Sequence, residues 1–350
     1  LDLPEDLVNG HDNSYDDHDW ALRYSPSGER DDRFPRGRVT GGSTSVNTTI
    51  ALRGIPADFD DWSAAGNPEW AWNATDGSPG AIARAHNRLE RDLDFGHLDH
   101  HGDAGPISIR RWRDDELVPT QAAFLDACEG YGFPRIADVN DPEPLGAGVM
   151  AMNKLGRLRI STAIGYLSSA RYRENLRIEA DTTVARLSIS NGRCTGVETT
   201  DGRDLRAHLV VVAAGAVLTP GILARSGIGD PDELASIGVD TVLSRPGVGA
   251  NLSDHPATAV LLVPRFPELC APELPLVQTI CRYTSEGSSA DFDVNIELMT
   301  RARGRGDEVY FMLAPSLEYV EGRGRVRQRS ADPSALPAIE PGFGANAADL

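Results

Sequence analysis

A continuous apolar run at 209–214, Leu-Val-Val-Val-Ala-Ala, is the feature that most constrains how this chain can fold. A run of this length without polar alternation is typical of a strand buried on both faces of a parallel sheet. Gly215 ends the run, Thr219-Pro220 supply the cap and first position of a helix over 221–226, and Gly227 closes that helix. The sequence therefore predicts a strand, a glycine turn and a helix, which is half of a nucleotide-binding βα unit in an α/β fold.

The rest of the chain mixes strand and helix patterns. Alternating apolar and polar residues predict a three-stranded meander over 176–178, 184–189 and 196–200, with a turn at Asp201-Gly202. Helical spacing predicts helices over 81–90 and 119–130, the second with Ala122, Ala123, Phe124, Ala127 and Cys128 on one side. Strands over 293–299 and 309–312 predict a second, mostly β element, whereas the first 35 residues predict an extended or loop-rich segment.

Length, charge and apolar content exclude several classes of protein. The length of 350 residues is typical of two domains, or of one large and one smaller domain. Acidic residues outnumber basic ones by 52 to 34, and the net charge of −18 excludes binding of nucleic acid or anionic membranes by charge alone. No apolar run approaches the roughly 18 to 20 residues of a membrane span, and residues 1–6 lack the features of a secretory signal. We therefore expect a soluble, cytoplasmic protein.

Two glycine-bearing patterns stand far apart in the chain. The first, over 36–47, contains Gly41-Gly42-Ser43, and the second, over 214–229, contains Gly215 and Thr219-Pro220-Gly221. Asn251-Leu252-Ser253-Asp254-His255 follows the second pattern. In content and order, these patterns resemble the signatures of the glucose-methanol-choline (GMC) oxidoreductases, flavoenzymes that use FAD to oxidise alcohols.

The resemblance implies an α/β fold: an incomplete, Rossmann-like FAD-binding domain of the two-dinucleotide-binding type, with a smaller, mostly β substrate domain. On this pattern the FAD-binding domain takes 1–80, which includes a flavin-contacting loop, and 156–255, which holds the meander and the buried strand. A helical or loop region on the substrate side connects them over 81–155, a compact substrate domain covers 256–330, and 331–350 return toward the FAD-binding domain. The short interval from 255 to 330 resembles that of compact members, some of them associated with the peptide cofactor mycofactocin.

Glycine chemistry gives the first pattern a physical meaning. Gly41 and Gly42 lack Cβ atoms, so the backbone can take a positive φ and bring its N–H groups close to a flat ring with an anionic edge. Asn47 follows Ser43 by about one helical turn and could return its amide to the same ligand. By itself Gly41-Gly42-Ser43 is equally typical of a plain turn into a helix. The resemblance assigns FAD contacts to this loop, and our candidates there are Val39, Gly42, Ser43, Asn47 and Ile50.

Two further candidates come from the second half of the chain. Val184 stands where the family presents a backbone to the adenine ring, although core packing explains an apolar strand residue equally well. Gly215, placed after a buried parallel strand, would let a nucleotide lie against the backbone. Covalently flavinylated relatives carry His where Val46 stands here, so the resemblance implies non-covalent FAD.

Histidines offer few catalytic or metal-binding candidates. An imidazole can act in proton transfer, but the resemblance makes the tract of His255 chiefly a structural junction, so His255 is a minor catalytic candidate. His97, His100 and His101 are adjacent in sequence without an evident set of carboxylates or cysteines, so we expect a polar loop and no metal site. The four cysteines lack metal-binding spacing and are expected to be free thiols.

Two family features are expected but do not occur in these residues. The family begins with a Gly-x-Gly-x-x-Gly loop that holds the FAD pyrophosphate, and it ends with a segment carrying the catalytic His; neither is present. We therefore expect no catalytic residue in this chain, and either a fragment of an FAD-dependent alcohol dehydrogenase or oxidase or a natural truncation. The expected partner is a small alcohol, with oxygen, a quinone or a carrier as electron acceptor. The alternative is a non-catalytic remnant that binds another protein or a nucleotide; a nicotinamide-dependent dehydrogenase is disfavoured because no buried strand precedes Gly41.

Overall fold

The computed structural model describes residues 3–25, 32–303 and 308–350, which fold into two compact units. The first unit comprises 1–19, 37–176 and 256–319, and the second comprises 20–36, 177–255 and 320–350. Each unit is thus assembled from three separate stretches of the chain. Among the described residues, no helix is both long and apolar enough to cross a membrane.

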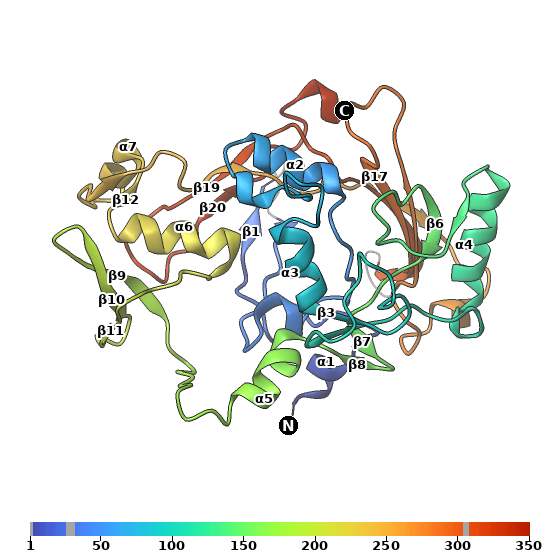
Figure 1. The fold of residues 1–350 in the computed structure, drawn as a ribbon, viewed down its shortest axis with the longest axis horizontal. Coiled ribbons are helices and arrows are strands. Elements are labelled where there is room, and N and C mark those ends of the chain that lie inside the picture. The colour runs from blue at the N-terminus through green and yellow to red at the C-terminus, as the bar shows by residue number, and fades with distance from the viewer. Residues whose placement is uncertain (1–2, 26–31, 304–307) are drawn as a thin grey trace. The chain divides into compact units, whose positions relative to one another are not determined.

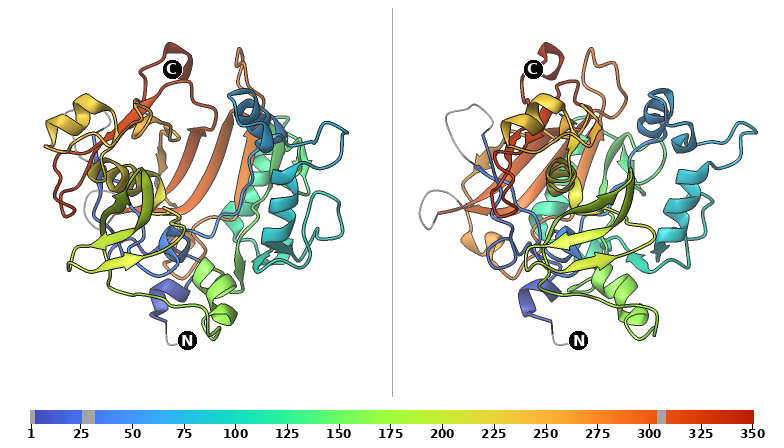
Figure 2. Two further views of the ribbon diagram at one scale, coloured as in Figure 1. Left: turned by 60° about the vertical axis from the view of Figure 1, so that its left-hand side comes forward. Right: turned by 90° about the vertical axis from the view of Figure 1, so that its left-hand side faces the viewer.

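A six-stranded sheet dominates the first unit (Figure 1). Its longest strands, β17 and β18, lie side by side and antiparallel (Figure 2, orange), which confirms the strands expected over 293–299 and 309–312. All neighbours in the sheet are antiparallel except β5 and β6, which are parallel. In spatial order the strands are β15 (Val260–Leu262), β18 (Val309–Leu317), β17 (Val294–Arg303), β16 (Thr279–Tyr283), β6 (Gly146–Val149) and β5 (Arg135–Ile136).

Helix α4 (Pro119–Gly130) has the predicted bounds and packs against β16 and β6 (Figure 1). Its expected face is correct only in part: Cys128 is buried and Phe124 packs against the core, whereas Ala123 and Ala127 are exposed. Gln121, Leu125 and Cys128 form the buried stripe. The three buried residues follow the i, i+4, i+7 spacing of one helical stripe, which small alanines on the neighbouring stripe had obscured.

Short elements complete the first unit around a core of Ile107, Ile109, Val139, Met150, Met152 and Ile280, among others. Helix α3 (Ala81–Leu89) confirms the helix expected over 81–90. It leads directly into β3 (Glu90–Asp92), which pairs in parallel with β4 (Ile107–Ile109). The remaining elements are α1 (Glu5–Val8), η1 (Gly42–Ser45), α2 (Pro56–Ala64), η2 (Pro68–Trp70), η3 (Asp114–Glu116), β7 (Lys154–Leu155), β8 (Leu158–Arg159), η4 (Ala163–Leu167), α5 (Ser168–Ala170) and η5 (Pro267–Cys270).

The predicted meander is present in the second unit. Strands β9 (Val184–Ser190), β10 (Arg193–Thr199) and β11 (Asp204–Arg206) form an antiparallel sheet in the order β11-β10-β9. The expected first strand at 176–178 is wrong: these residues are irregular, and Leu176 and Ile178 are exposed. The third strand comes after the turn at Asp201-Gly202 rather than before it.

The apolar run at 209–214 is not a buried strand. These residues are irregular, and Leu209 and Val211 are 80% and 78% exposed. A parallel strand needs backbone partners on its neighbours, and no strand among the described residues pairs with this run. Helix α6 (Gly215–Arg225) also begins earlier than expected, so that Pro220 lies inside it rather than at its first turn. Gly227 does follow the helix with a φ of 79°, as predicted.

A second core lies in the second unit, built from Leu22, Phe34, Val217, Val326 and Ile339. It joins α6 to the strands near both ends of the described chain. The other elements are β1 (Arg23–Tyr24), β2 (Asp32–Arg33), β12 (Ile228–Gly229), α7 (Pro231–Ser236), β13 (Leu243–Ser244), β14 (Ala250–Leu252), β19 (Gly324–Arg327), β20 (Ala338–Glu340) and η6 (Ala347–Asp349).

Candidate functional site

The glycine loop of the first unit turns sharply into the short helix η1. Gly41 and Gly42 have φ values of 94° and 57°, and the Gly42 N–H donates to the Val39 carbonyl over 2.8 Å. Gly37 donates its N–H to the Ser43 hydroxyl over 3.1 Å. These contacts confirm the turn into a helix that the glycines and hydroxyl residues predict.

The three glycines of this loop are required for different reasons. A Cβ at Gly37 would lie 2.5 Å from the Gly42 carbonyl oxygen, and one at Gly41 would collide with the Ser45 hydroxyl. A Cβ at Gly42 would meet no atom within 4 Å. Because Gly42 combines a positive φ with open space beside its backbone, its surroundings fit the approach of a flat ligand.

Hydroxyl groups fasten the loop to the segment around Thr162. The Thr44 hydroxyl donates to the Gly41 carbonyl over 2.6 Å and accepts the Thr162 N–H over 3.0 Å. The Ser45 hydroxyl donates to the Thr40 carbonyl over 2.9 Å. The glycine backbone is therefore held in place by its own neighbours and by the residues before η4, without needing a ligand to order it.

A buried arginine, Arg159, also holds the same loop in place, and no pattern in the sequence had indicated it. The Arg159 side chain is fully buried in β8, and its guanidinium donates to six backbone carbonyls. Burial lowers its pKa from the usual arginine value, and Asp6 opposes that shift. The acceptors are the carbonyls of Asp6, Leu7, Asn9, Asp12, Ser45 and Asn47.

The remaining loop candidates lie along the same path. The Asn47 N–H donates to the Ser43 carbonyl over 3.1 Å, and the Asn47 side chain accepts the Thr49 N–H over 3.1 Å. The amide oxygen of Asn47 therefore already accepts a hydrogen bond within the loop, so a ligand would not be the sole partner of this side chain. Ile50 forms a β-bridge with Met152. The structure therefore places Val39, Gly42, Ser43, Asn47 and Ile50 on one continuous segment of the first unit.

The other two candidates lie in the second unit. Val184 begins β9 and pairs with Thr199, and Gly215 begins α6 with a φ of 82° and no atom within 4 Å of an added Cβ. Strand β9 is bound to the end of α6, because Arg225 Nε donates to the Ala185 carbonyl over 2.7 Å. Gly215 thus offers an open backbone at a helix start, although the buried strand expected before it is absent.

His255 lies in the second unit as an exposed residue after β14. Its backbone N–H donates to the Asp254 carboxylate over 3.0 Å. Asn251, in β14 of the same tract, has a φ of 58°, and the residues that follow β14 are irregular.

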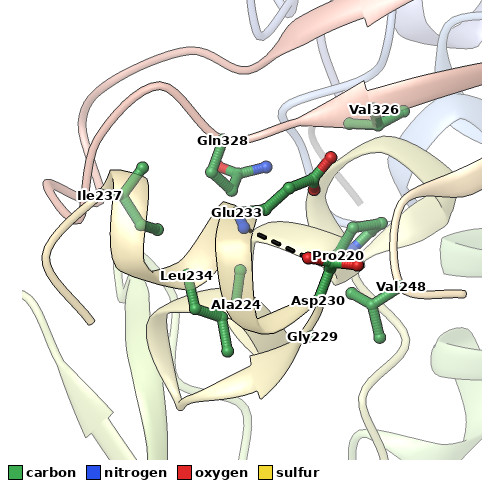
Figure 3. Close-up of a pocket in the computed structure, with 10 residues that line it drawn as sticks. All are labelled: Pro220, Ala224, Gly229, Asp230, Glu233, Leu234, Ile237, Val248, Val326 and Gln328. Atoms are coloured by element: carbon green, nitrogen blue, oxygen red, sulfur yellow. Dashed lines mark hydrogen bonds between the residues drawn. The ribbon is translucent and has the colours of Figure 1, made fainter. Parts of the chain in front are cut away.

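A small pocket of the second unit lies between α6 and α7 (Figure 3). Its volume of about 20 Å³ admits roughly one water molecule. Asp230 at its edge caps α7 by accepting the N–H groups of Asp232 and Glu233 over 2.9 and 3.4 Å. The pocket is therefore a packing defect beside a helix cap and is too small for a substrate.

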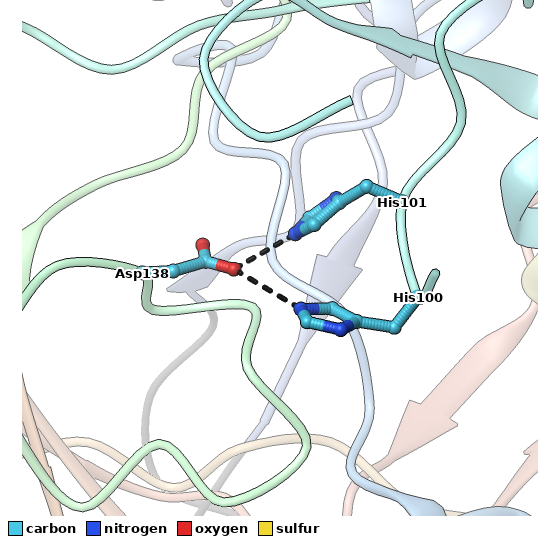
Figure 4. A group of neighbouring side chains, drawn as sticks. All are labelled: His100, His101 and Asp138. Carbon is cyan, nitrogen blue, oxygen red and sulfur yellow. Dashed lines mark hydrogen bonds and ion pairs between the residues drawn. The ribbon is translucent and has the colours of Figure 1, made fainter. Parts of the chain in front are cut away.

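Residues 97–101 form turns and bends, as expected for a loop, but His101 at its end is buried in a cluster of charged side chains. His101 is fully buried; its Nδ1 lies 2.7 Å from Glu90 Oε1 and its Nε2 lies 2.8 Å from Asp138 Oδ2 (Figure 4 shows Asp138 facing both His100 and His101). The carboxylates that the sequence seemed to lack come from β3 and from the segment after β5. Sequence spacing could not reveal them, because 48 positions separate Glu90 from Asp138.

Protein cations balance the charges of this cluster. Arg111 pairs with Asp92 and Asp138, each over 2.5 Å, and Arg53 pairs with Glu90. Burial disfavours a charged imidazole, but the hydrogen bonds to Asp138 and Glu90 outweigh it and raise the pKa of His101 to about 9. Burial likewise opposes the charge of Asp138, yet His101 and Arg111 hold its pKa well below the usual range.

Two triads in this cluster have donor atoms within 4.8 Å of one another, as a metal centre would require. They are His100, His101 and Asp138, and Glu90, Asp92 and His101. With His101 protonated, three cations (His101, Arg53 and Arg111) face three carboxylates (Glu90, Asp92 and Asp138). Arg53 and Arg111 thus already pair with the carboxylates that would bind a metal ion. We interpret the cluster as a closed ion-pair network and assign no metal to it.

Comparison with known proteins identifies the family to which this chain belongs. A family model described as GMC oxidoreductase matches residues 27–257. The chain therefore belongs to the GMC oxidoreductase family, and FAD is the cofactor that this membership supports. The mixed α/β fold expected from the resemblance is confirmed.

Individual relatives show how far the similarity extends. An uncharacterized GMC-type oxidoreductase of Rhodococcus erythropolis is 34% identical over 346 residues, covering 95% of this chain and 65% of that protein. The 5-(hydroxymethyl)furfural oxidase of Methylovorus sp. (strain MP688) is 36% identical over 237 residues, covering 65% of this chain and 42% of that protein. The crystal structure of pyridoxine 4-oxidase from Mesorbium loti superposes with a TM-score of 0.84 at 25% identity, covering 99% of this chain and 70% of that chain. The chain thus spans about two thirds of the length of the Rhodococcus relative.

Proposed function

We propose that these residues are part of an FAD-dependent enzyme that oxidises the CH–OH group of a small alcohol. The observation that carries the proposal is the family match together with two named relatives, an oxidase of 5-(hydroxymethyl)furfural and a 4-oxidase of pyridoxine, both of which are hydroxymethyl compounds. Bound FAD would supply the hydride acceptor. The electron acceptor that reoxidises it is oxygen, a quinone or a carrier.

The chain's own part is to hold and orient the cofactor without a covalent link. Val39, Gly42, Ser43, Asn47 and Ile50 are the proposed FAD contacts of the first unit, and Val184 and Gly215 those of the second. Gly42 and Gly215 support this assignment most directly, because each has a positive φ and nothing within 4 Å of an added Cβ. We assign no catalytic residue among the described residues; His255 is the minor candidate for a proton acceptor.

Flavin binding tests the glycine assignment with matched controls. In the full-length protein, Gly215→Ala should weaken FAD binding about tenfold, because the added methyl group would occupy the space in which the ligand contacts the Gly215 backbone. Gly202→Ala is the control, because Gly202 lies in the same unit with a φ of 85° and equally open surroundings. Gly42→Ala is compared with Gly192→Ala, whose φ of 72° is also left-handed and whose Cβ position is also open. Equal FAD affinities within both pairs would overturn the assignment.

Anaerobic reduction tests the reaction itself. A panel of hydroxymethyl arenes and choline, mixed with the purified full-length protein without oxygen, should bleach the visible flavin absorbance for at least one alcohol. The corresponding methyl ethers serve as controls, because they lack the hydroxyl proton. Protein that retains FAD but is not bleached by any alcohol would refute alcohol oxidation, and protein that retains no FAD would refute the cofactor contacts.

A further inference from the structure

The chain contains a single lysine, Lys154, and the structure buries it completely at the start of β7. Its ammonium nitrogen lies 3.2 Å from the centroid of the Trp112 ring. Among the described residues, Lys154 Nζ has no hydrogen-bond partner. An amine with three donor positions is thus held in the protein interior without an acceptor, which is costly if the amine is charged.

Two neighbouring side chains share this lack of partners. Trp112 Nε1 and His11 Nδ1 are also buried without a hydrogen-bond partner among the described residues. The His11 and Trp112 rings pack against each other with centroids 5.3 Å apart. The His11 ring also has hydrogen bonds to the backbone of Glu273 and Gly156, so the acceptor that is missing is the one for Lys154 Nζ and Trp112 Nε1.

The electrostatic surroundings favour an anion over a cation. Burial, followed by the charges of Arg110 and Arg157 with Glu116 opposing them, lowers the pKa of Lys154 to about 7. Burial and the charges of Lys154 and Arg157 lower the pKa of His11 to about 4. Both groups are therefore neutral in slightly alkaline solution. Arg110 is paired with Glu116 over 2.5 Å, so Arg157 supplies the net positive charge nearby.

We propose that Lys154 is a carbamylation site, at which the buried amine reacts reversibly with carbon dioxide to form an N-carboxylated lysine. The Nζ lone pair forms a bond to the carbon of CO2, one C=O bond becomes the C–O⁻ of the carbamate, and one N–H proton leaves to solvent. No oxidant, reductant or metal is needed. CO2 is small and uncharged, so local opening of the structure suffices for its entry.

The product would satisfy the groups that are orphaned in the amine form. A carbamate offers two acceptor oxygens where Trp112 Nε1 lacks an acceptor, and its negative charge lies near Arg110 and Arg157. The modification would exchange an unpaired amine for a paired anion and tie the β7–β8 hairpin to Trp112. This inference is independent of the proposed alcohol oxidation.

Carbon-13 NMR of the full-length protein tests the proposal. Protein equilibrated with ¹³C-labelled bicarbonate at about pH 8 should show a carbamate resonance that is absent from Lys154→Met, a variant that keeps an unbranched apolar stem without the amine. The difference between the two spectra removes carbamates of the α-amino group and of any lysine outside these residues. No difference resonance at saturating bicarbonate would overturn the proposal.

A second variant tests the acceptor argument without removing the lysine. Trp112→Phe keeps an aromatic face under the amine but loses the indole N–H, so carbamate occupancy at fixed bicarbonate should fall about tenfold, the effect of one hydrogen bond to a charged group. Unchanged occupancy would refute this site. Thermal unfolding supplies a second readout: bicarbonate should raise Tm in the wild type and not in Lys154→Met. An equal rise with chloride would mean adventitious anion binding only, and would also refute carbamylation.

Discussion

Replacing His101 by glutamine tests the charge balance of the buried network that also contains Glu90, Asp92, Asp138 and Arg111. The pKa of His101 is about 9 in the folded protein and 6.5 for an unperturbed histidine. That difference of about 2.5 units corresponds to about 3 kcal/mol, because each unit is worth about 1.4 kcal/mol. The conversion applies without a screening discount because the side chain is fully buried.

The sign follows from proton binding. Between pH 6.5 and 9 the folded protein holds a proton on His101 that the unfolded chain releases, so rising pH favours unfolding. The stabilisation is therefore fully present below pH 6.5 and is lost as the pH rises through 9. In His101→Gln this dependence disappears, since glutamine does not titrate.

Urea unfolding at a series of pH values from about 6 to 9.5 measures the effect. The free energy of unfolding of wild type minus that of His101→Gln should fall by about 3 kcal/mol across this range. Taking the difference between the two proteins is essential, because Lys154 makes the free energy of unfolding rise with pH over part of the same range. That contribution is common to both proteins and cancels in the difference. His97→Gln is the control, since His97 is exposed.

A difference between wild type and His101→Gln that does not vary with pH would refute the assignment of a buried imidazolium. If the variant does not fold, NMR titration of the wild-type imidazole gives the same information. Its resonance should remain that of the protonated form at pH 8, and a midpoint near 6.5 would contradict the network.

Three further predictions concern stability and are each measured by urea unfolding. Arg159→Met removes the donor to six backbone carbonyls and should cost at least 3–5 kcal/mol or prevent folding, whereas a loss below about 1 kcal/mol would show that water replaces the guanidinium. Gly37→Ala should cost about 1–3 kcal/mol, because its Cβ would lie 2.5 Å from the Gly42 carbonyl oxygen, and it should exceed the cost of Gly247→Ala, where no atom lies within 4 Å and φ is not positive. In CO2-free buffer Lys154→Met should be more stable than wild type by about 5 kcal/mol at pH 6, because the folded pKa of about 7 lies below 10.5, and the gain should vanish as the pH rises through 10.5; a gain that does not depend on pH would contradict a buried amine.

Local patterns predicted local structure well. The helix at 119–130 was found with its bounds because proline at its first position and glycine at its last mark its two ends, although apolar spacing gave its buried face only in part. Two strands of the meander were found because apolar and polar residues alternate along them and Asp201-Gly202 marks a turn. The strand at 209–214 failed because a strand depends on partners, which an apolar run can suggest but cannot supply.

The candidate site divides in the same way. Positive φ at Gly42 and Gly215 follows from residue type, and the structure shows it at both. The carbonyl cage of Arg159 and the carboxylates around His101 depend on segments distant in sequence, such as the pairing of residue 159 with residues 6–12. No spacing rule reports such contacts, so these two networks could be recognised only in three dimensions.

The core that joins Leu22 and Phe34 to Val326 and Ile339 has a consequence for synthesis on the ribosome. Leu22 and Ile339 stand more than 300 positions apart in the sequence. The second unit therefore cannot complete its core until β19 and β20 have left the ribosome. Until then Leu22 and Phe34 are apolar surface without cover, exposed to chaperones and to neighbouring nascent chains. Yield in the cell should therefore depend more on translation speed and chaperone supply than the stability of the finished protein would suggest.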